Sequence, residues 1–451
     1  MTGDRRIINR ALRRPFSAVD ETSVAGSYPA MESSKEHRPG EAPRTRRSWQ
    51  FVLGYGAAQA GAFITFIPLL TLLLPLKAEA LAGGEKALLL SQIAMIGGIT
   101  AAAANYVIGA LSDATPGRFG RRRPWMVVGC LGAGSALMAI QAAPDLPILI
   151  LAVIAFQLAV NAVYGPLLAL VPDLVPDGQK GLLSAVAGLA LPIANLFTAL
   201  LAILMIRAPQ ASYAITAVVA AALILPLALG VREEARPNRE AKVRLSLRAL
   251  KDREFGLAFL ARLAAESTVA IHTLFLLFFI QGLPADTLPP GWNAAALFGA
   301  LLVVSTIAAT LAGLIGGVMS DKLRRRRAFV VAGCLAMGAA MTVFVSWPSI
   351  AGLATAQILF GVGHGLHAAV VAAMNAEILP EPKQAGRDLG VMNIAVALPQ
   401  TLAPAGAALL FAAGLPLSAV FASAAVLAAL AAGFLGLMRE RSRTSLAVEK
   451  A

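Results

Sequence analysis

The sequence predicts an all-α membrane protein of twelve transmembrane helices, arranged as two pseudo-symmetric bundles of six, with both termini in the cytoplasm. Three observations lead to this fold class: an apolar composition, a one-sided distribution of positive charge, and a loop that occurs twice. The 451 residues have a mean hydropathy of +0.72, and only 14% of them are charged. Soluble domains contain about 25% charged residues, so the composition excludes a soluble globular protein.

Apolar stretches long enough to cross a bilayer, each of about 20 residues, follow one another along the chain. We predict twelve of them, at residues 50–75, 88–111, 125–143, 147–170, 182–206, 211–231, 256–281, 295–319, 328–346, 349–373, 387–413 and 416–437. Some contain proline, which a membrane helix tolerates because neighbouring helices satisfy the freed backbone groups. These stretches indicate a multi-pass integral membrane protein.

Positive charge is concentrated on alternate loops between these segments. With the N-terminus placed in the cytoplasm, 27 Lys and Arg residues from Arg44 onward fall on the cytoplasmic side and three on the other, namely Lys77, Lys86 and Arg207. This is the pattern of the positive-inside rule, and omitting one helix would destroy it. The net charge of +13 therefore indicates a lipid bilayer as partner, in the plasma (inner) membrane, and not a nucleic acid.

One loop motif occurs in both halves of the chain. GALSDATPGRFGRRRPW at 109–125 returns as GGVMSDKLRRRRAF at 316–329, and Asp113 and Asp321 are 208 positions apart. A cysteine follows each motif, at Cys130 and Cys334, and is expected to be an apolar filler and not a disulfide partner. The repeat predicts two related six-helix domains, of the kind that hold a solute between them near the membrane midplane.

The repeat also sets the expected domain boundaries. We expect a disordered cytoplasmic tail at 1–44, an N-terminal bundle at 45–231, a charged cytoplasmic linker at 232–254, a C-terminal bundle at 255–438 and a cytoplasmic tail at 439–451. The first tail is polar and basic, and it lacks the apolar run of a secretory signal.

Over roughly residues 45–440 the chain resembles the major facilitator superfamily of transporters. The resemblance rests on Gly109, Ser112, Asp113, Gly120 and Arg121–Arg123, and on a weaker copy at Gly317, Ser320, Asp321 and Arg324–Arg327. The form SD…FGRRRPW looks most like the branch of cation-coupled sugar symporters, which includes the glycoside–pentoside–hexuronide symporters and the sucrose transporters. The resemblance implies alternating access and a monomer.

The repeated loop has two interpretations. In the family its first copy is thought to latch the two halves while the cavity faces outward, which implies that Asp113 contacts the N-terminus of the eleventh helix. The arginines could instead only fix the membrane topology. Gly109 is expected to allow close packing and Gly120 a tight turn. The residues assigned to the latch are Gly109, Ser112, Asp113, Gly120, Arg121, Arg122 and Arg123, with Gly317, Asp321, Arg324 and Arg325 in the second copy.

Polar side chains inside the spans mark the expected solute path, because they are costly in lipid. They gather in the first, fourth, seventh and tenth helices, which line the cavity in the family that the chain resembles. The candidate solute-binding residues are Tyr55, Gln59, Gln157, Asn161, Tyr164, Asn195, His272, His364, Asn393 and Gln400. Neutral amides converging on a cavity suit a hydroxyl-rich solute.

Arg262 and Glu266 form the only charged pair well inside a predicted span. Counted from Phe255, Glu266 lies about 16 Å along the seventh helix, near the midplane. The i, i+4 spacing lets the two side chains touch, although Arg before Glu is the less stabilising order. A carboxylate that can exchange an arginine for a proton is what a proton symporter needs, whereas the alternative is a self-neutralising structural ion pair.

The coupling ion is therefore expected to be a proton, and no cofactor is expected. Sodium is disfavoured because the melibiose-type members of the resembled branch carry acids within helices 2 and 4, where this chain has Asn105, Gln157 and Asn161. His364 and His367 share a helix face, but without a third ligand they do not indicate a metal site.

These features favour a secondary active transporter that works by alternating access and imports a sugar or glycoside with protons. The alternative is proton-driven efflux of drug-like or other small organic solutes on the same fold. A homologue that senses a solute without transporting it stays open as a further alternative. An enzyme is not expected, since the sequence contains no phosphate-binding loop and no nucleophile motif.

Overall fold

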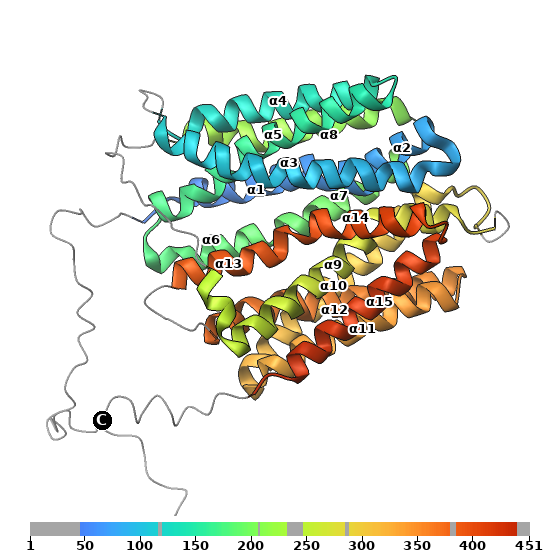
Figure 1. Cartoon of the computed structure of the whole chain (residues 1–451). Coiled ribbons are helices and arrows are strands. Elements are labelled where there is room, and N and C mark those ends of the chain that lie inside the picture. Colours follow the sequence, from blue (N-terminus) through green and yellow to red (C-terminus); the bar gives the residue numbers. More distant parts are fainter. Residues whose placement is uncertain are drawn as a thin grey trace, which may run out of the picture. The chain divides into compact units, whose positions relative to one another are not determined.

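The computed structural model describes residues 46–115, 120–205, 208–231, 247–284, 288–378 and 385–439. Every element in these ranges is helical (Figure 1). The expected N-terminal tail, most of the 232–254 linker and nearly all of the C-terminal tail fall outside the described residues.

The N-terminal half consists of eight α-helices and three short helical turns. They are α1 (Trp49–Pro68), η2 (Leu69–Leu73), α2 (Leu74–Ala82), η3 (Gly83–Glu85), α3 (Lys86–Ala114), α4 (Arg123–Ala142), α5 (Leu146–Leu174), α6 (Asp177–Gly188), α7 (Ala190–Leu204), η4 (Pro209–Ala211) and α8 (Ser212–Gly230).

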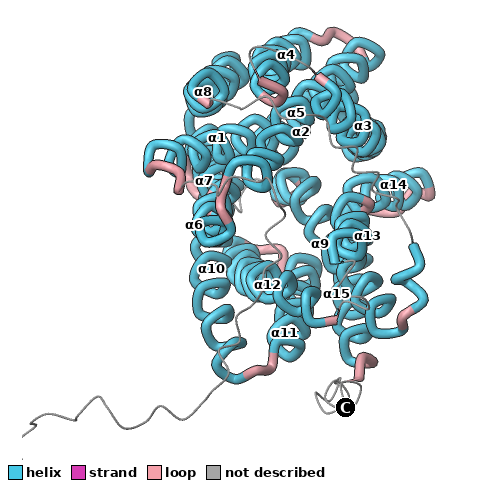
Figure 2. The backbone as a smooth tube through the Cα atoms, turned by 90° about the vertical axis from the view of Figure 1, so that its left-hand side faces the viewer, coloured by secondary structure: helices cyan, strands magenta, loops and turns pink. Residues whose placement is uncertain are grey.

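The C-terminal half repeats this order of long helices. It contains η5 (Leu247–Lys251), α9 (Arg253–Gln281), α10 (Ala294–Leu323), α11 (Arg326–Ser346), α12 (Ile350–Glu377), α13 (Ala385–Ala397), α14 (Pro399–Ala412) and α15 (Leu417–Gly436). Viewed along the helices, α4, α5 and α8 group on one side and α10, α11, α12 and α15 on the other (Figure 2).

Eleven stretches of the described residues are long and apolar enough to cross a membrane. The first of them, Trp49–Ser112, is 64 residues long and contains both of the first two predicted segments. Within it the chain turns at Gly83, whose φ is +52°, and α2 packs against α3. Each of the other stretches corresponds to one remaining predicted segment.

Three of the predicted segments are interrupted, each next to a proline. The π-helix η2 directly follows Pro68, α6 and α7 meet at Leu189 shortly before Pro192, and α13 and α14 meet at Leu398, directly before Pro399. Proline has no N–H to donate, and its ring clashes with the carbonyl four residues earlier. The regular hydrogen-bond ladder is therefore broken at these points, which kinks a helix or shifts its register.

Glycines allow α12 to pack closely against both α10 and α11. A Cβ atom added at Gly365 would lie 2.1 Å from the carbonyl oxygen of Ala309 on α10, and one at Gly363 would lie 2.6 Å from that of Gly333 on α11. No side chain fits at such distances, so the helix backbones are in direct contact. The GVGHG segment of α12 is therefore packed tightly between α10 and α11.

The two halves contact each other from the middle of the bundle to the helix ends that are remote from the basic loops. Across the halves, α7 packs against α10 and α14 packs against α3, whereas α6 packs against α1 and α13 against α9 within their own halves. A Cβ atom at Gly299, near the start of α10, would lie 2.9 Å from the carbonyl oxygen of Ala199 on α7. One at Gly98 of α3 would lie 2.8 Å from that of Gln400 on α14.

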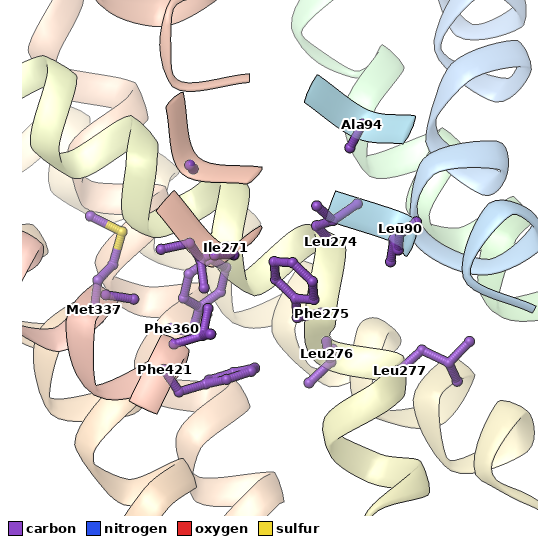
Figure 3. Close-up of a cluster of buried hydrophobic side chains, with 14 of the residues drawn as sticks. Leu90, Ala94, Ile271, Leu274, Phe275, Leu276, Leu277, Met337, Phe360 and Phe421 are labelled. Atoms are coloured by element: carbon purple, nitrogen blue, oxygen red, sulfur yellow. The ribbon is translucent and has the colours of Figure 1, made fainter. Parts of the chain in front are cut away.

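Apolar side chains fill the space between α3 and α9 at the same end (Figure 3). Leu90 and Ala94 of α3 lie opposite Leu274 of α9, and Leu277 extends the cluster along α9. All four belong to the largest buried apolar cluster, which continues into the C-terminal half. The core therefore crosses the boundary between the halves at this end.

A polar network caps this cluster. Lys86 Nζ lies 2.6 Å from Glu79 Oε1 and donates to Gln281 Oε1 at 2.7 Å. Gln281 Nε2 in turn donates to Glu79 Oε2 at 2.7 Å. Because Gln281 ends α9 while Glu79 and Lys86 belong to α2 and α3, these hydrogen bonds tie one half to the other.

Candidate functional site

Glu266 lies between two nitrogen-bearing side chains in the C-terminal half. Its Oε1 atom is 3.7 Å from Nε of Arg262, one turn earlier on α9, and 4.0 Å from Nε2 of His367 on α12. The side chain of His367 is buried, and those of Arg262 and Glu266 are about one-fifth exposed, at 19% and 21%. The contact expected between Arg262 and Glu266 is therefore present, and His367 completes a cluster of three.

The three members of this cluster are close but not hydrogen-bonded. Arg262 Nε and His367 Nε2 are buried, and neither has a hydrogen-bond partner in the described structure. Separations of 3.7 and 4.0 Å exceed those of hydrogen bonds. Glu266 can therefore exchange partners without first breaking a short, well-formed bond.

Close packing of α11 and α12 places a thiol behind His367. Cys334 Sγ lies 3.8 Å from His367 Nδ1, and a Cβ atom at the neighbouring Gly333 would come within 3.0 Å of the His367 backbone nitrogen. Both native cysteines are buried and free, as the sequence predicts. A thiol is a weak donor and an imidazole nitrogen can accept from it, so Cys334 helps to orient the His367 ring.

The histidine of α9 contacts other residues of α12. His272 Nε2 lies 3.2 Å from Gln357 Oε1 of α12, and its ring stacks on Phe360 with centroids 3.6 Å apart. His364, one turn after Phe360 on the same helix, also stacks with it, and the two ring centroids are 6.0 Å apart. The predicted binding residues His272 and His364 thus share one aromatic partner.

Neutral polar groups occupy the N-terminal half. Gln59 Nε2 donates to the Tyr55 hydroxyl at 2.7 Å, both on α1, and Phe63 of α1 meets Tyr164 of α5 edge to face at 6.0 Å. Tyr55 and Gln59 are buried and Tyr164 is half-buried. Among these four residues, Tyr55, Gln59 and Tyr164 are predicted solute-binding residues, and the contacts supply phenol, amide and aromatic groups.

The remaining predicted binding residues are more scattered. Asn161 donates to the backbone oxygen of Gln157 on the same helix, at 2.8 Å, and Asn195 is half-buried on α7. Asn393 on α13 and Gln400 on α14 are exposed, and Gln400 contacts α3 through its backbone. The structure therefore does not bring the predicted residues into one continuous group.

In the first basic loop, the arginines pair with an acid that the sequence analysis did not select. Arg121 Nη2 and Arg122 Nη2 lie 2.9 and 3.3 Å from Asp173 Oδ2, at the end of α5. Arg122 Nη1 also donates to the Ser112 hydroxyl at 2.7 Å, while Arg123 begins α4.

The glycines of the predicted latch differ in their surroundings. Gly120 has a φ of +89°, so it makes the expected tight turn. A Cβ atom at Gly109 or Gly317 would meet no described atom within 4 Å, so the helices described do not pack closely there. The side chain of Asp113 and the loop residues 116–119 lie outside the described residues.

The second basic loop has the same arrangement, in which the assigned Asp321 takes part but Arg326 and Glu377 stand in place of the assigned Arg324 and Arg325. Arg326 lies 2.8 Å from both Asp321 Oδ1 and Glu377 Oε1, whereas Arg324 and Arg325 are exposed. Arg326 stands 204 positions after Arg122, and Glu377 stands 204 positions after Asp173. The pairing of a loop arginine with an acid at the end of the fourth helix of each half is therefore repeated.

The duplicated basic loop and the two related helical halves correspond to one known family. The family profile described as Major Facilitator Superfamily matches residues 51–294 and 291–450. The chain belongs to the major facilitator superfamily. A comparison with curated proteins found no match.

Solved structures of other transporters share this facilitator fold. The nucleoside transporter NupG, as a mutant, superposes with a TM-score of 0.67 at 12% identity, covering 86% of this chain and 100% of that one. The peptide transporter POT in complex with sulfate gives 0.70 at 11%, covering 88% and 96%. A bacterial homologue of the human lysosomal transporter Spinster, inward-facing and occupied, gives 0.60 at 14%, covering 86% and 96%. At these identities the likeness concerns the fold alone.

Three contacts of this facilitator could not be read from its sequence. His367 meets Glu266, Gln357 meets His272, and Asp173 meets two loop arginines. The first two join α9 to α12 and the third joins a loop to the end of α5. The available signal was weak: His367 was visible only as a polar residue on a central helix, and Asp173 only as an acid at a helix end.

Proposed function

We propose that this facilitator imports a sugar or glycoside together with protons, by alternating access of a site between its two halves. The observation that carries the proposal is the Arg262–Glu266–His367 cluster. Ionisable groups inside a membrane span are costly and mark functional paths. Here a carboxylate lies within 4.0 Å of an arginine and a histidine and forms a hydrogen bond with neither.

Such a carboxylate suits proton coupling for an electrostatic reason. The positive charge of Arg262 stabilises the ionised form of Glu266. When the arginine moves or binds another group, the buried carboxylate loses this stabilisation and its protonated form is favoured. A change of partner during the transport cycle therefore loads or releases one proton. The opposing half supplies Tyr55, Gln59 and Tyr164, which carry no charge and can bond to solute hydroxyl groups.

We further infer twelve membrane passes with both termini and the basic loops in the cytoplasm, as the positive-inside rule requires. In this orientation the Glu79–Lys86–Gln281 network and the Gly299 contact close the outer end, and the Gly98 contact holds α3 against α14 near the middle of the bundle. The arrangement supports a conformation that opens toward the cytoplasm. The pairing of loop arginines within their own halves fits this state, because a latch between the halves is then not needed.

The test is uptake of a radiolabelled sugar panel into proteoliposomes under an imposed inward proton gradient. Glu266→Gln is expected to abolish gradient-driven accumulation while exchange of labelled for unlabelled solute continues, because exchange needs no net proton movement. Glu254→Gln is the matched control, since it makes the same chemical change in the first turn of the same helix.

Each outcome has a distinct meaning. Sugar uptake that survives Glu266→Gln would place coupling elsewhere and leave the cluster a structural role. Absence of uptake for every sugar, together with gradient-driven movement of lipophilic cations, would replace the import proposal with export.

A further inference from the structure

We propose that the Arg262–Glu266–His367 cluster binds a carboxylate group of the transported solute, so that the cargo is a hydroxylated organic acid such as a sugar acid. The inference rests on the proposed function and narrows its substrate class. It is carried by two buried nitrogen donors that converge on one place from different helices and are not satisfied by the protein.

The first of these donors is the Nε–H group of Arg262. Nε of Arg262 is buried without a partner, and its nearest carboxylate oxygen, on Glu266, is 3.7 Å away. Buried donors without partners are unfavourable and uncommon in folded proteins. A guanidinium presents a rigid planar fork that matches the two oxygens of a carboxylate, so the group that best completes Arg262 is a carboxylate.

The second donor is the ring of His367. Its Nε2 atom is also buried without a partner, while Nδ1 lies 3.8 Å from the thiol of Cys334. If Nδ1 accepts from that thiol, the neutral ring carries its proton on Nε2 and can donate to an oxygen. Nε2 faces the same Glu266 oxygen as Arg262 does, at 4.0 Å. A solute carboxylate that enters this region can therefore accept hydrogen bonds from Arg262 on α9 and from His367 on α12 at the same time.

A neutral sugar would bind to this cluster more weakly than a sugar acid does. A hydroxyl group is a weaker acceptor for a guanidinium than a carboxylate is, because only the latter forms charge-assisted, bidentate bonds. The polar patch of Tyr55, Gln59 and Tyr164 in the other half is uncharged and suits hydroxyl groups. A solute with one acidic end and several hydroxyl groups matches both halves.

The proposal also explains why solute and proton would travel together. A second carboxylate beside Glu266 is repelled unless Glu266 is neutral. When a proton binds to the Glu266 carboxylate, an O–H bond forms, no other bond breaks, and Arg262 is released to the solute. Among the described residues, the charged and titratable groups that face Glu266 are Arg262 on its own helix, His367 from α12 and Cys334 from α11. Binding of the anion and of the proton then favour each other reciprocally.

The experiment compares matched solutes in proteoliposomes under an inward proton gradient. The acids are glucuronate and gluconate, and the neutral counterparts are glucuronamide and glucose. Uptake of at least one acid is expected to exceed that of both neutral compounds by about tenfold or more. Arg262→Gln is expected to remove this preference, Arg262→Lys to retain part of it, and His367→Gln to weaken binding of the acid.

Lys251→Gln is the matched control, because it also removes one positive charge but at an exposed position before α9. Equilibrium binding of labelled glucuronate to purified, monodisperse protein serves as a second readout that requires no transport. Proton-driven uptake of glucose or glucuronamide without binding or uptake of either acid would overturn this inference and leave the proposed function intact. If neither the acids nor the neutral compounds are bound or taken up, the inference and sugar import are both wrong.

Discussion

Gln281→Ala is expected to loosen the contact that holds the two halves together at the end opposite the basic loops. Gln281 is the only described side chain of α9 in the polar network there, and it exchanges hydrogen bonds of 2.7 Å with both Lys86 and Glu79. The Lys86–Glu79 pair lies within one half and survives when the halves separate. The two bonds made by Gln281 are lost on separation, so they favour the closed arrangement.

The size of the effect follows from the exposure of these groups. A hydrogen bond to a charged group contributes about 1.5–3 kcal/mol when buried. Lys86 and Glu79 are 24% and 37% exposed, and solvent screening reduces such contributions to about 0.2–1 kcal/mol each. Losing both bonds therefore costs about 0.4–2 kcal/mol, which changes the ratio of open to closed molecules by about 2–30-fold.

The assay is the rate at which a maleimide labels a cysteine introduced at Leu90, which is fully buried between the halves. The native Cys130 and Cys334 are buried and their labelling is subtracted using the protein without the reporter. Labelling should accelerate about 2–30-fold in Gln281→Ala. Gln141→Ala is the control, since the described hydrogen bonds of the Gln141 side chain go only to Gln210, within the same half. An unchanged rate in Gln281→Ala would refute the reasoning.

Two further predictions concern glycines at close helix contacts. Gly98→Val places a Cβ atom 2.8 Å from the carbonyl oxygen of Gln400; it should force α3 and α14 apart and lower the steady-state transport rate about tenfold or more, and wild-type rates in this variant would mean that the contact is dispensable. Gly333→Val places a Cβ atom 2.7 Å from the carbonyl oxygen of Gly363; overpacking of this kind costs about 1–3 kcal/mol, so the melting temperature should fall, and an unchanged melting temperature would contradict the close approach of α11 and α12.

Several features of this protein follow from residues that are near one another in the chain. Membrane spans depend on the mean hydropathy of about 20 consecutive residues, and topology depends on the charges of short loops. The contact between Arg262 and Glu266 follows from helix geometry, because residues four apart lie on one face. The tight turn at Gly120 was expected from its residue type, and its φ is +89°.

Other features depend on residues that are distant in the chain. His367 meets Glu266 across about 100 positions, and this meeting depends on how closely α12 approaches its neighbours at Gly363 and Gly365. Hydropathy cannot predict it, because lipid is as apolar as a packed helix interface and both faces of a membrane helix look alike in sequence. Likewise, the exposure of Asn393 and Gln400 in the structure does not follow from their positions in an apolar span.

The sequence by itself determined the helical class, the positions of the spans, the duplication and the ionisable pair on α9, because each is expressed in local periodicity, length or charge. Only the tertiary structure decided that His367 and Cys334 join that pair, that the loop arginines meet Asp173 and Glu377, and at which end the halves touch. These depend on backbone-to-backbone distances between helices, which arise from the packing of the whole bundle and are encoded in no single stretch of the chain.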